Sequence, residues 1–158
     1  MKNRGLVTGT FDLLHEGHVN FVKQALKECR ELVIGVESDE RVKQRKGKGR
    51  PINRQEKRKA QLKKIFPETQ VVILPNDFGK EQVRRDFLDF YQIETLFTTQ
   101  DDPFVENKRQ LMLEREGEVK MVPKNEAIST TQILESGAGV EKIIFAEDRQ
   151  KMSKWRQE

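Results

Sequence analysis

Short runs of aliphatic and β-branched residues alternate along the chain with longer stretches in which apolar residues recur every three or four positions. This alternation is typical of βα units around a parallel sheet. The short runs predict five strands, at Gly5–Thr8, Leu32–Glu37, Gln70–Leu74, Thr95–Thr98 and Glu118–Val122. The longer stretches predict helices over His18–Cys29, Gln55–Phe66, Lys80–Tyr91 and Val105–Glu116, and a short helix near Ser129.

Five strands with helices between them predict an α/β protein, a three-layer α/β/α Rossmann-like sandwich with a five-stranded parallel sheet. Right-handed crossovers would place helices on both faces of the sheet. Ligands of such sheets bind beyond the carboxyl ends of the strands, where the strand order reverses. We expect one domain over residues 1–137, followed by a helical C-terminal extension over residues 138–158.

Composition narrows the class of protein. A chain of 158 residues suits one domain, and no apolar stretch is long enough to cross a bilayer. The N-terminus runs directly into a predicted strand rather than into a signal peptide. The single cysteine, Cys29, excludes an internal disulfide and a cysteine-rich metal site. These features predict a soluble cytoplasmic protein without a membrane span.

Positive charge is concentrated in one part of the chain. Twelve lysine and arginine residues lie between Arg41 and Lys64, against Glu56 alone. Such a cluster favours polyanions, namely nucleic acid, anionic lipid or the phosphates of a nucleotide. A solvated helix face would have the same composition, so charge alone leaves these alternatives open.

The turn after the first predicted strand combines three features that suit phosphate binding. Gly9 and Gly17 allow the backbone to approach a ligand closely. The helix that follows offers unpaired N–H groups to an anion. Both histidines of the chain, His15 and His18, lie in this turn, where imidazoles can donate hydrogen bonds to phosphate oxygens. Surface histidines or a metal site remain alternatives, although the chain has no further histidine to complete a metal site.

The whole turn, Gly9-Thr10-Phe11-Asp12-Leu13-Leu14-His15-Glu16-Gly17-His18, resembles the HxGH signature of the cytidylyltransferase-like nucleotidyltransferases. The form GTFDLLHxGH is similar to the glycerol-3-phosphate cytidylyltransferase group. Three further segments follow in the family's order: Glu37–Glu40, Arg50–Arg58 with its E-x-R ending, and Pro123–Thr131 with Ile-Ser-Thr-Thr at its end. The resemblance covers most of the chain.

The resemblance implies a nucleotidyltransferase that moves a nucleoside monophosphate from a triphosphate to a phosphorylated small molecule and releases pyrophosphate. Its implied catalytic residues are His15, His18, Lys48 and Arg58. The implied substrate-binding residues are Gly9, Thr10, Phe11, Asp12, Gly17, Asp39, Lys46, Asp101, Asp102, Lys124, Ile128, Ser129, Thr130 and Thr131. Mg²⁺ would travel with the nucleotide rather than occupy a protein metal site. Because the attacking phosphate is already ionised, no general base is required.

Two departures from the family pattern concern the substrates. The group usually carries Gly-Asp-Asp-Trp after its fourth strand, whereas this chain has Gln100-Asp101-Asp102-Pro103, which puts glycerol 3-phosphate in doubt as acceptor. The segment Lys64-Ile65-Phe66-Pro67 lacks the arginine that cytidine-specific members place near the base. CMP transfer from CTP is favoured, and AMP transfer from ATP is the alternative.

A non-catalytic nucleotide- or RNA-binding protein is the competing function. RNA recognition usually adds exposed aromatic residues for stacking, and the basic stretch has only Phe66 nearby, so nucleic acid is not an expected partner. A homodimer is expected because relatives are commonly dimers. Lys151-Met152-Ser153-Lys154 matches the start of a synthetase motif, but we interpret it as an exposed basic terminal helix that Trp155 docks on the domain or on a second subunit.

Overall fold

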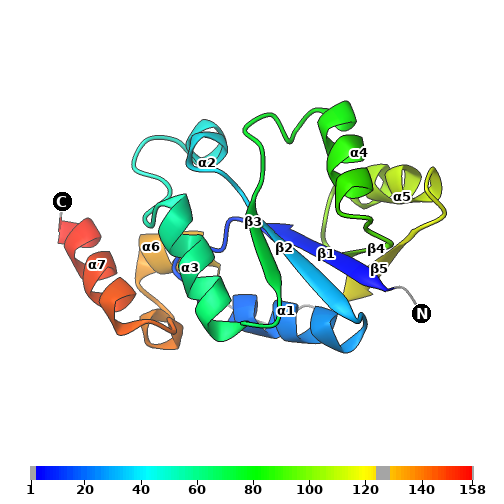
Figure 1. Ribbon diagram of the computed structural model, residues 1–158. Coiled ribbons are helices and arrows are strands. Elements are labelled where there is room, and N and C mark those ends of the chain that lie inside the picture. The colour runs from blue at the N-terminus through cyan, green and yellow to red at the C-terminus, as the bar shows by residue number, and fades with distance from the viewer. Residues whose placement is uncertain (1–2, 124–128, 158) are drawn as a thin grey trace.

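The computed structural model describes residues 3–123 and 129–157. Figure 1 shows a single sheet with helices on both sides. The strands are β1 Arg4–Gly9, β2 Glu31–Val36, β3 Gln70–Ile73, β4 Thr95–Thr99 and β5 Glu118–Val122. The helices are α1 Glu16–Lys27, α2 Asp39–Lys46, α3 Gln55–Ile65, α4 Glu81–Phe90, α5 Val105–Leu113, α6 Thr130–Ser136 and α7 Ala146–Gln157, with a 3-10 turn at Val140–Lys142.

The strands form a five-stranded sheet in the order β3-β2-β1-β4-β5, and every pairing is parallel. The predicted three-layer α/β fold is therefore confirmed. The chain moves outward from β1 to β3 and then returns to β4 on the other side of β1, so the strand order reverses between β1 and β4. Ligands of open α/β sheets bind at the carboxyl ends of the strands beside such a reversal.

Alternation of side chains along the strands gives the sheet two apolar faces. Val7, Ile34 and Phe97 pack on one face with residues from α1 and α3. Leu6, Val33 and Leu96 occupy the other face, where α4 and α5 cover them. Burial on both faces explains why each strand appears in the sequence as a short continuous apolar run.

Helix α2 was not among the helices predicted from the sequence. Its eight residues carry one buried side chain, Val42, so no apolar periodicity marks it. The helix is stabilised instead by polar contacts at its N-terminus. Ser38 accepts a hydrogen bond from the Arg41 N–H at 3.2 Å, and Asp39 and Glu40 lie in the first turn, where acidic side chains stabilise a helix.

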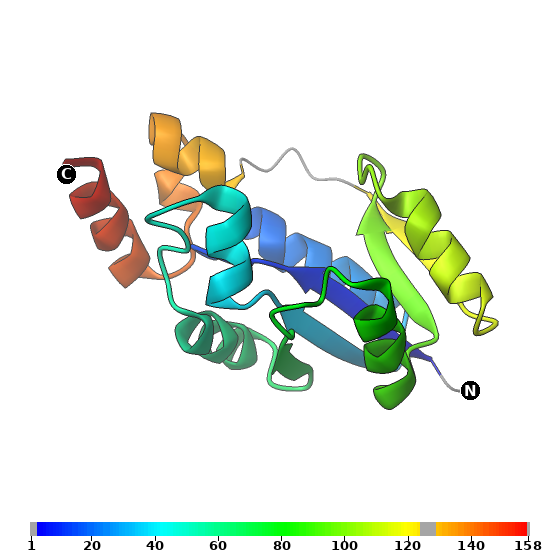
Figure 2. The same ribbon diagram turned by 90° about the horizontal axis from the view of Figure 1, so that it is seen from above.

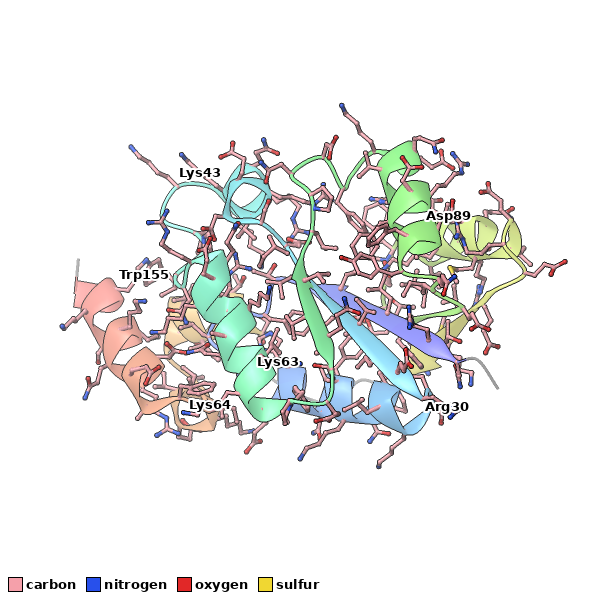
Figure 3. All side chains as sticks on the ribbon, viewed as in Figure 1. Arg30, Lys43, Lys63, Lys64, Asp89 and Trp155 are labelled. Carbon is pink, nitrogen blue, oxygen red and sulfur yellow. The ribbon has the colours of Figure 1, made fainter. Side chains whose placement is uncertain are left out.

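The C-terminal extension packs against the domain beside α6, as both views show (Figures 1 and 2). Met152 and Ile143 are buried in a third apolar cluster with Leu13 and residues of α6. Trp155, which we expected to dock the terminal helix on the domain or on a second subunit, is 39% exposed, and it lies near the C-terminal end of α7 (Figure 3). Met152, three residues earlier on α7, is buried and packs the helix against the domain. No helix within the described residues could span a membrane.

Candidate active site

The two histidines lie together at the start of α1, immediately after the loop that leaves β1. His15 is the N-cap of the helix, and its Nδ1 accepts a hydrogen bond from the Gly17 N–H at 3.1 Å. His18 Nδ1 accepts one from the His15 N–H at 3.3 Å. The imidazoles stack, with 3.8 Å between ring centroids and 23° between ring planes.

This arrangement fixes the protonation of both rings. A nitrogen that accepts a backbone N–H carries no proton, so each neutral imidazole carries its proton on Nε2. Burial lowers the pKa of His15 to about 4. Burial also lowers the pKa of His18 well below its ordinary value, and repulsion from His15 and Lys46 acts in the same direction. His15 Nε2 is buried and has no hydrogen-bond partner among the described residues. The pair therefore offers neutral N–H donors to a ligand.

The loop before the histidines is held in a strained conformation. Phe11 and Leu13 have positive φ angles of 54° and 50°, each of which costs roughly 1–2 kcal/mol for a residue with a side chain. Between them, the buried Asp12 carboxylate accepts hydrogen bonds from the Ile52 N–H at 2.6 Å and the Asn53 N–H at 2.9 Å. Asp12, predicted as a substrate ligand, thus orients the turn.

A cavity of about 310 Å³ opens in front of the histidines. Its lining comes from the end of β1, the histidine turn, α2 and the start of α6: Thr8, Gly9, Thr10, Phe11, His15, His18, Phe21, Lys46, Ser129, Thr130 and Thr131. Gly9 packs tightly here, because a Cβ atom at this position would lie 3.1 Å from the Phe11 ring, which would have to shift slightly. Nine of the residues predicted from the sequence therefore meet around one cavity.

Among the described residues, Lys46 is the one cationic side chain in this lining. Burial lowers its pKa, and the neighbouring Arg50 and Arg45 lower it further. A cation that is partly desolvated and repelled by its neighbours gains from binding an anion. Lys46 therefore suits contact with a phosphate.

The start of α6 forms the opposite wall. Ser129 caps the helix, accepting the Gln132 N–H at 3.2 Å, while Gln132 Oε1 accepts the Ser129 N–H at 2.9 Å. Thr130 Oγ1 donates to the Asp12 carbonyl at 2.8 Å and so joins this wall to the histidine turn. Thr131 is exposed and lines the cavity. Lys124 and Ile128, also predicted as ligands, lie outside the described residues.

Arg58 does not lie where the sequence predicted it. Its side chain is fully buried, and its guanidinium donates to the carbonyls of Asn53, Thr10 and Glu37, each at 2.8 Å. The fourth contact is an ion pair with Asp39 at 2.7 Å. The expected contact with phosphate is therefore corrected: Arg58 holds the ends of β1 and β2 against α3, because strand-end carbonyls lacking strand partners need a donor. Asp39, also predicted as a ligand, is the partner of this arginine.

The remaining predicted residues lie apart from the histidine cavity. Gly17 supplies an N–H to His15 rather than lining the cavity. Lys48 is exposed in the loop between α2 and α3 and lines neither of the two cavities at this edge of the sheet. Asp101 and Asp102 line the second, larger cavity. No group of three or more metal-binding side chains occurs among residues 3–123 and 129–157.

A family model for cytidylyltransferase-like proteins matches residues 6–136, which run from within β1 to the end of α6. The chain belongs to the cytidylyltransferase-like family. It is 30% identical over 137 residues to the bifunctional protein HldE of Shewanella sediminis, covering 83% of this chain and 27% of that protein. HldE of Pseudomonas paraeruginosa is 35% identical over 133 residues, covering 80% and 26%. The chain thus spans about a quarter of the length of these curated relatives.

Solved structures show the same fold at low sequence identity. A lipopolysaccharide core biosynthesis protein from Thermoplasma volcanium has a TM-score of 0.64 and 21% identity, over 81% of this chain and all of that one. A bifunctional NMN adenylyltransferase/ADP-ribose pyrophosphatase from Francisella tularensis, complexed with AMP and manganese, has a TM-score of 0.67 and 13% identity, over all of this chain and 50% of that one. As a member of the cytidylyltransferase-like family with this fold, the chain is a nucleotidyltransferase.

Proposed function

We propose that this nucleotidyltransferase moves AMP from ATP to a phosphorylated small molecule and releases pyrophosphate. The observation that carries the proposal is the stacked histidine pair, whose Nδ1 atoms accept backbone N–H groups at the mouth of a cavity lined by Lys46. An acceptor phosphate oxygen attacks the α-phosphorus, and the bond from that phosphorus to the oxygen bridging to the β-phosphate breaks. The electron pair leaves with pyrophosphate.

The protein's part in this step is to position two anions and to stabilise the charge that develops on them. His15 and His18 would donate from Nε2 to the α-phosphoryl oxygens, which gain charge in the transition state. Lys46 and the α6 start at Ser129–Thr131 would bind the departing pyrophosphate, with Lys48 and Lys124 as further candidates. Mg²⁺ would be carried by the triphosphate, whose oxygens and water would supply its ligands.

Adenine is preferred over cytosine on two grounds. First, the NMN adenylyltransferase that shares this fold, with a TM-score of 0.67, was solved with AMP. Second, the segment Lys64–Pro67 lacks the arginine that cytidine-specific members place near the base. CMP transfer from CTP is the second candidate, which the Gly9–His18 sequence favours.

A pyrophosphate-release screen of the full chain tests the proposal. ATP and CTP are each paired with polyol, amino-alcohol and sugar phosphates and with a flavin nucleotide. We expect release with ATP and one class of acceptor, and release with CTP alone would move the assignment to cytidylyl transfer. Salt-sensitive RNA binding, with no pyrophosphate released by any pair, would make the chain a binding protein instead.

Replacing His18 by alanine provides the mechanistic control for this screen. Loss of a donor to the developing charge should lower kcat by about 100- to 1,000-fold, while circular dichroism shows an unchanged fold. Lys23, exposed on the same helix, gives a matched variant, Lys23→Ala, that should retain full activity. Near-normal turnover of the His18 variant would remove the histidine from the mechanism.

A further inference from the structure

A second, larger cavity of about 730 Å³ adjoins the histidine cavity. It lies over the carboxyl ends of β1 and β4 and is bounded by residues of α2, α4 and α5. The two cavities share Thr8, Gly9, Thr10 and Phe21, so they meet at the end of β1. Because neither histidine lines the larger cavity, a ligand bound there would reach the histidines only through this shared edge.

Charged side chains in the larger cavity are mostly paired. Its lining contains four cationic and three carboxylate side chains. Arg45 pairs with Glu37 at 2.7 Å, and Lys108 pairs with Asp102. Arg41 and Arg84 remain, and neither forms an ion pair within the described part of the chain. Two guanidinium groups therefore face this cavity without a counter-ion.

The two arginines come from different helices and contact adjacent residues, Phe78 and Gly79, of the loop between β3 and α4. Arg84 Nε donates to the Phe78 carbonyl at 2.9 Å, and its guanidinium lies 6.0 Å from the centroid of the Phe78 ring. Arg41 lies against Gly79, where a Cβ atom would come within 2.7 Å of Arg41 Nη1. Arg41 Nε is buried and has no hydrogen-bond partner among the described residues. Both guanidinium groups therefore lie beside this loop without a carboxylate partner, and Arg41 has an unused donor.

We propose that Arg41 and Arg84 bind an anionic group of the acceptor, a phosphate or a carboxylate. A planar guanidinium fork matches either oxyanion, and an anion in this cavity would supply a counter-ion to arginines that lack one and an acceptor for the unpaired donor on Arg41. This inference deepens the proposed function and rests on it for the identity of the ligand as the acceptor.

The lining distinguishes this site from the triphosphate site. Neither Arg41 nor Arg84 lines the histidine cavity, and among the described residues no acidic side chain does. The larger cavity carries Glu37, Asp101 and Asp102, whose carboxylates can accept hydrogen bonds from the hydroxyl groups of a small molecule. An acceptor with hydroxyl groups and an anionic end fits this lining.

Binding can be measured without turnover. The Nε–H signals of Arg41 and Arg84 are followed by nuclear magnetic resonance in the full chain, labelled with 15N-arginine, and are assigned from Arg41→Gln and Arg84→Gln. The probes are inorganic phosphate and acetate, each added at constant ionic strength so that screening does not change. We expect both signals to move with one shared dissociation constant, and the tighter probe identifies the anion. Substitution of either arginine should weaken binding about tenfold or more.

Matched controls come from the same helices. Lys43 is exposed and extends outward from α2 (Figure 3), and Arg85 pairs with Glu114 at 2.9 Å outside the cavity. Lys43→Gln and Arg85→Gln should leave probe binding unchanged. Equal weakening by these controls, or no movement of the Arg41 and Arg84 signals with either probe, would overturn the proposal.

A kinetic measurement links the arginine pair to the acceptor. With the acceptor that the screen identifies, Arg41→Gln and Arg84→Gln should each raise its KM about tenfold and leave the KM of the triphosphate within about twofold. A rise confined to the KM of the triphosphate would overturn the assignment. If no pyrophosphate is released but both arginines bind the probe, the proposed function fails and the anion site stands. If pyrophosphate is released but neither arginine signal moves with a probe, the proposed function stands and the anion site fails.

Discussion

The histidine turn illustrates how one residue can serve both the fold and the chemistry. His15 caps α1 through Nδ1, and His18 in turn caps the His15 N–H through its own Nδ1. These contacts satisfy backbone donors that a helix start leaves unpaired. Because Nδ1 of each ring accepts a hydrogen bond, the proton of each neutral ring lies on Nε2. The capping contacts therefore leave Nε2–H free to donate to a phosphate.

Burial of the histidines predicts a pH dependence of stability. The pKa of His15 is about 4 in the folded chain against an ordinary value of 6.5, so between these values the unfolded chain binds more protons. The free energy of unfolding should therefore rise with pH from about 4 to 6.5 and level off above 7. For His15 alone, the loss between pH 7.0 and 5.5 is about 1 kcal/mol, and the lowered pKa of His18 adds to it.

Urea unfolding at several pH values measures this dependence. Because the chain contains only two histidines, a His15→Asn/His18→Asn double variant should show almost no slope between pH 7.0 and 5.5. His15→Asn alone should show a reduced slope. The same slope in all three proteins would mean that the rings are not buried in neutral form.

At the scale of elements, two buried side chains and the main chain of Asn53 connect segments that are distant in sequence. Arg58 on α3 binds carbonyls at the ends of β1 and β2, and Asp12 binds two backbone N–H groups of the segment before α3. Asn53 belongs to that segment and donates its N–H to Asp12 while its carbonyl accepts from Arg58. These contacts hold the carboxyl edge of the sheet in one arrangement.

Replacing Arg58 tests this structural role against the phosphate-binding role predicted from the sequence. Arg58→Ala would leave buried carbonyls and Asp39 without their donor, so the free energy of unfolding should fall by about 3–5 kcal/mol. Arg58→Lys should restore little of it, because one ammonium cannot reach partners arranged around a planar fork. Normal stability combined with a raised KM for the triphosphate would return Arg58 to the phosphate site. Urea unfolding and initial-rate kinetics separate the outcomes.

The elements themselves were predictable where burial leaves a periodic pattern. The five strands and helices α1, α3, α4 and α5 lie within a few residues of their predicted bounds, because each buries an apolar face. Helix α2 lacks such a face, since Val42 is its one buried side chain. The role of Arg58 was missed for a related reason: a sequence shows that a cation follows a glutamate, but not that its partners are main-chain carbonyls from other elements.

The arginine pair of the larger cavity shows a further limit of prediction. Arg41 lay in the basic stretch recognised from the sequence, but nothing in the sequence separated it from its eleven basic neighbours. Arg84 lies outside that stretch, and the two line one cavity only because α2 and α4 both border the loop at Phe78 and Gly79. Contacts that arise from the fold of distant segments leave no local pattern.

On the scale of the whole molecule, the C-terminal helix is part of the candidate active site's support. Ile143 pairs with His15 in an antiparallel bridge, and the Ile144 N–H donates to the Leu14 carbonyl at 2.8 Å. Asp148 on α7 is fully buried and accepts hydrogen bonds from Asn53 Nδ2 and Gln61 Nε2, both at 3.0 Å. The extension therefore reaches the histidine turn both directly and through Asn53.

Replacing Asp148 by alanine should consequently affect more than the terminal helix. It would leave two buried amide groups without an acceptor, and the free energy of unfolding should fall by about 2–4 kcal/mol. Because Asn53 would lose one of its fixed partners, the Ile52 and Asn53 amides that bind Asp12 should exchange hydrogen faster, and kcat should fall. Hydrogen exchange, urea unfolding and pyrophosphate release measure the three effects.

Glu147 supplies the matched control, because it is the preceding residue on α7, is exposed and lies 3.8 Å from Lys57 in a weak surface contact. Glu147→Ala should change stability by no more than about 0.5 kcal/mol and leave exchange at Ile52 and Asn53 unaltered. If the terminal helix were an independent appendage, Asp148→Ala would release α7 while those amides and kcat stayed as in the wild type. Faster exchange at Ile52 and Asn53 in the Asp148 variant alone would show that stability at the C-terminus is transmitted to the histidine turn.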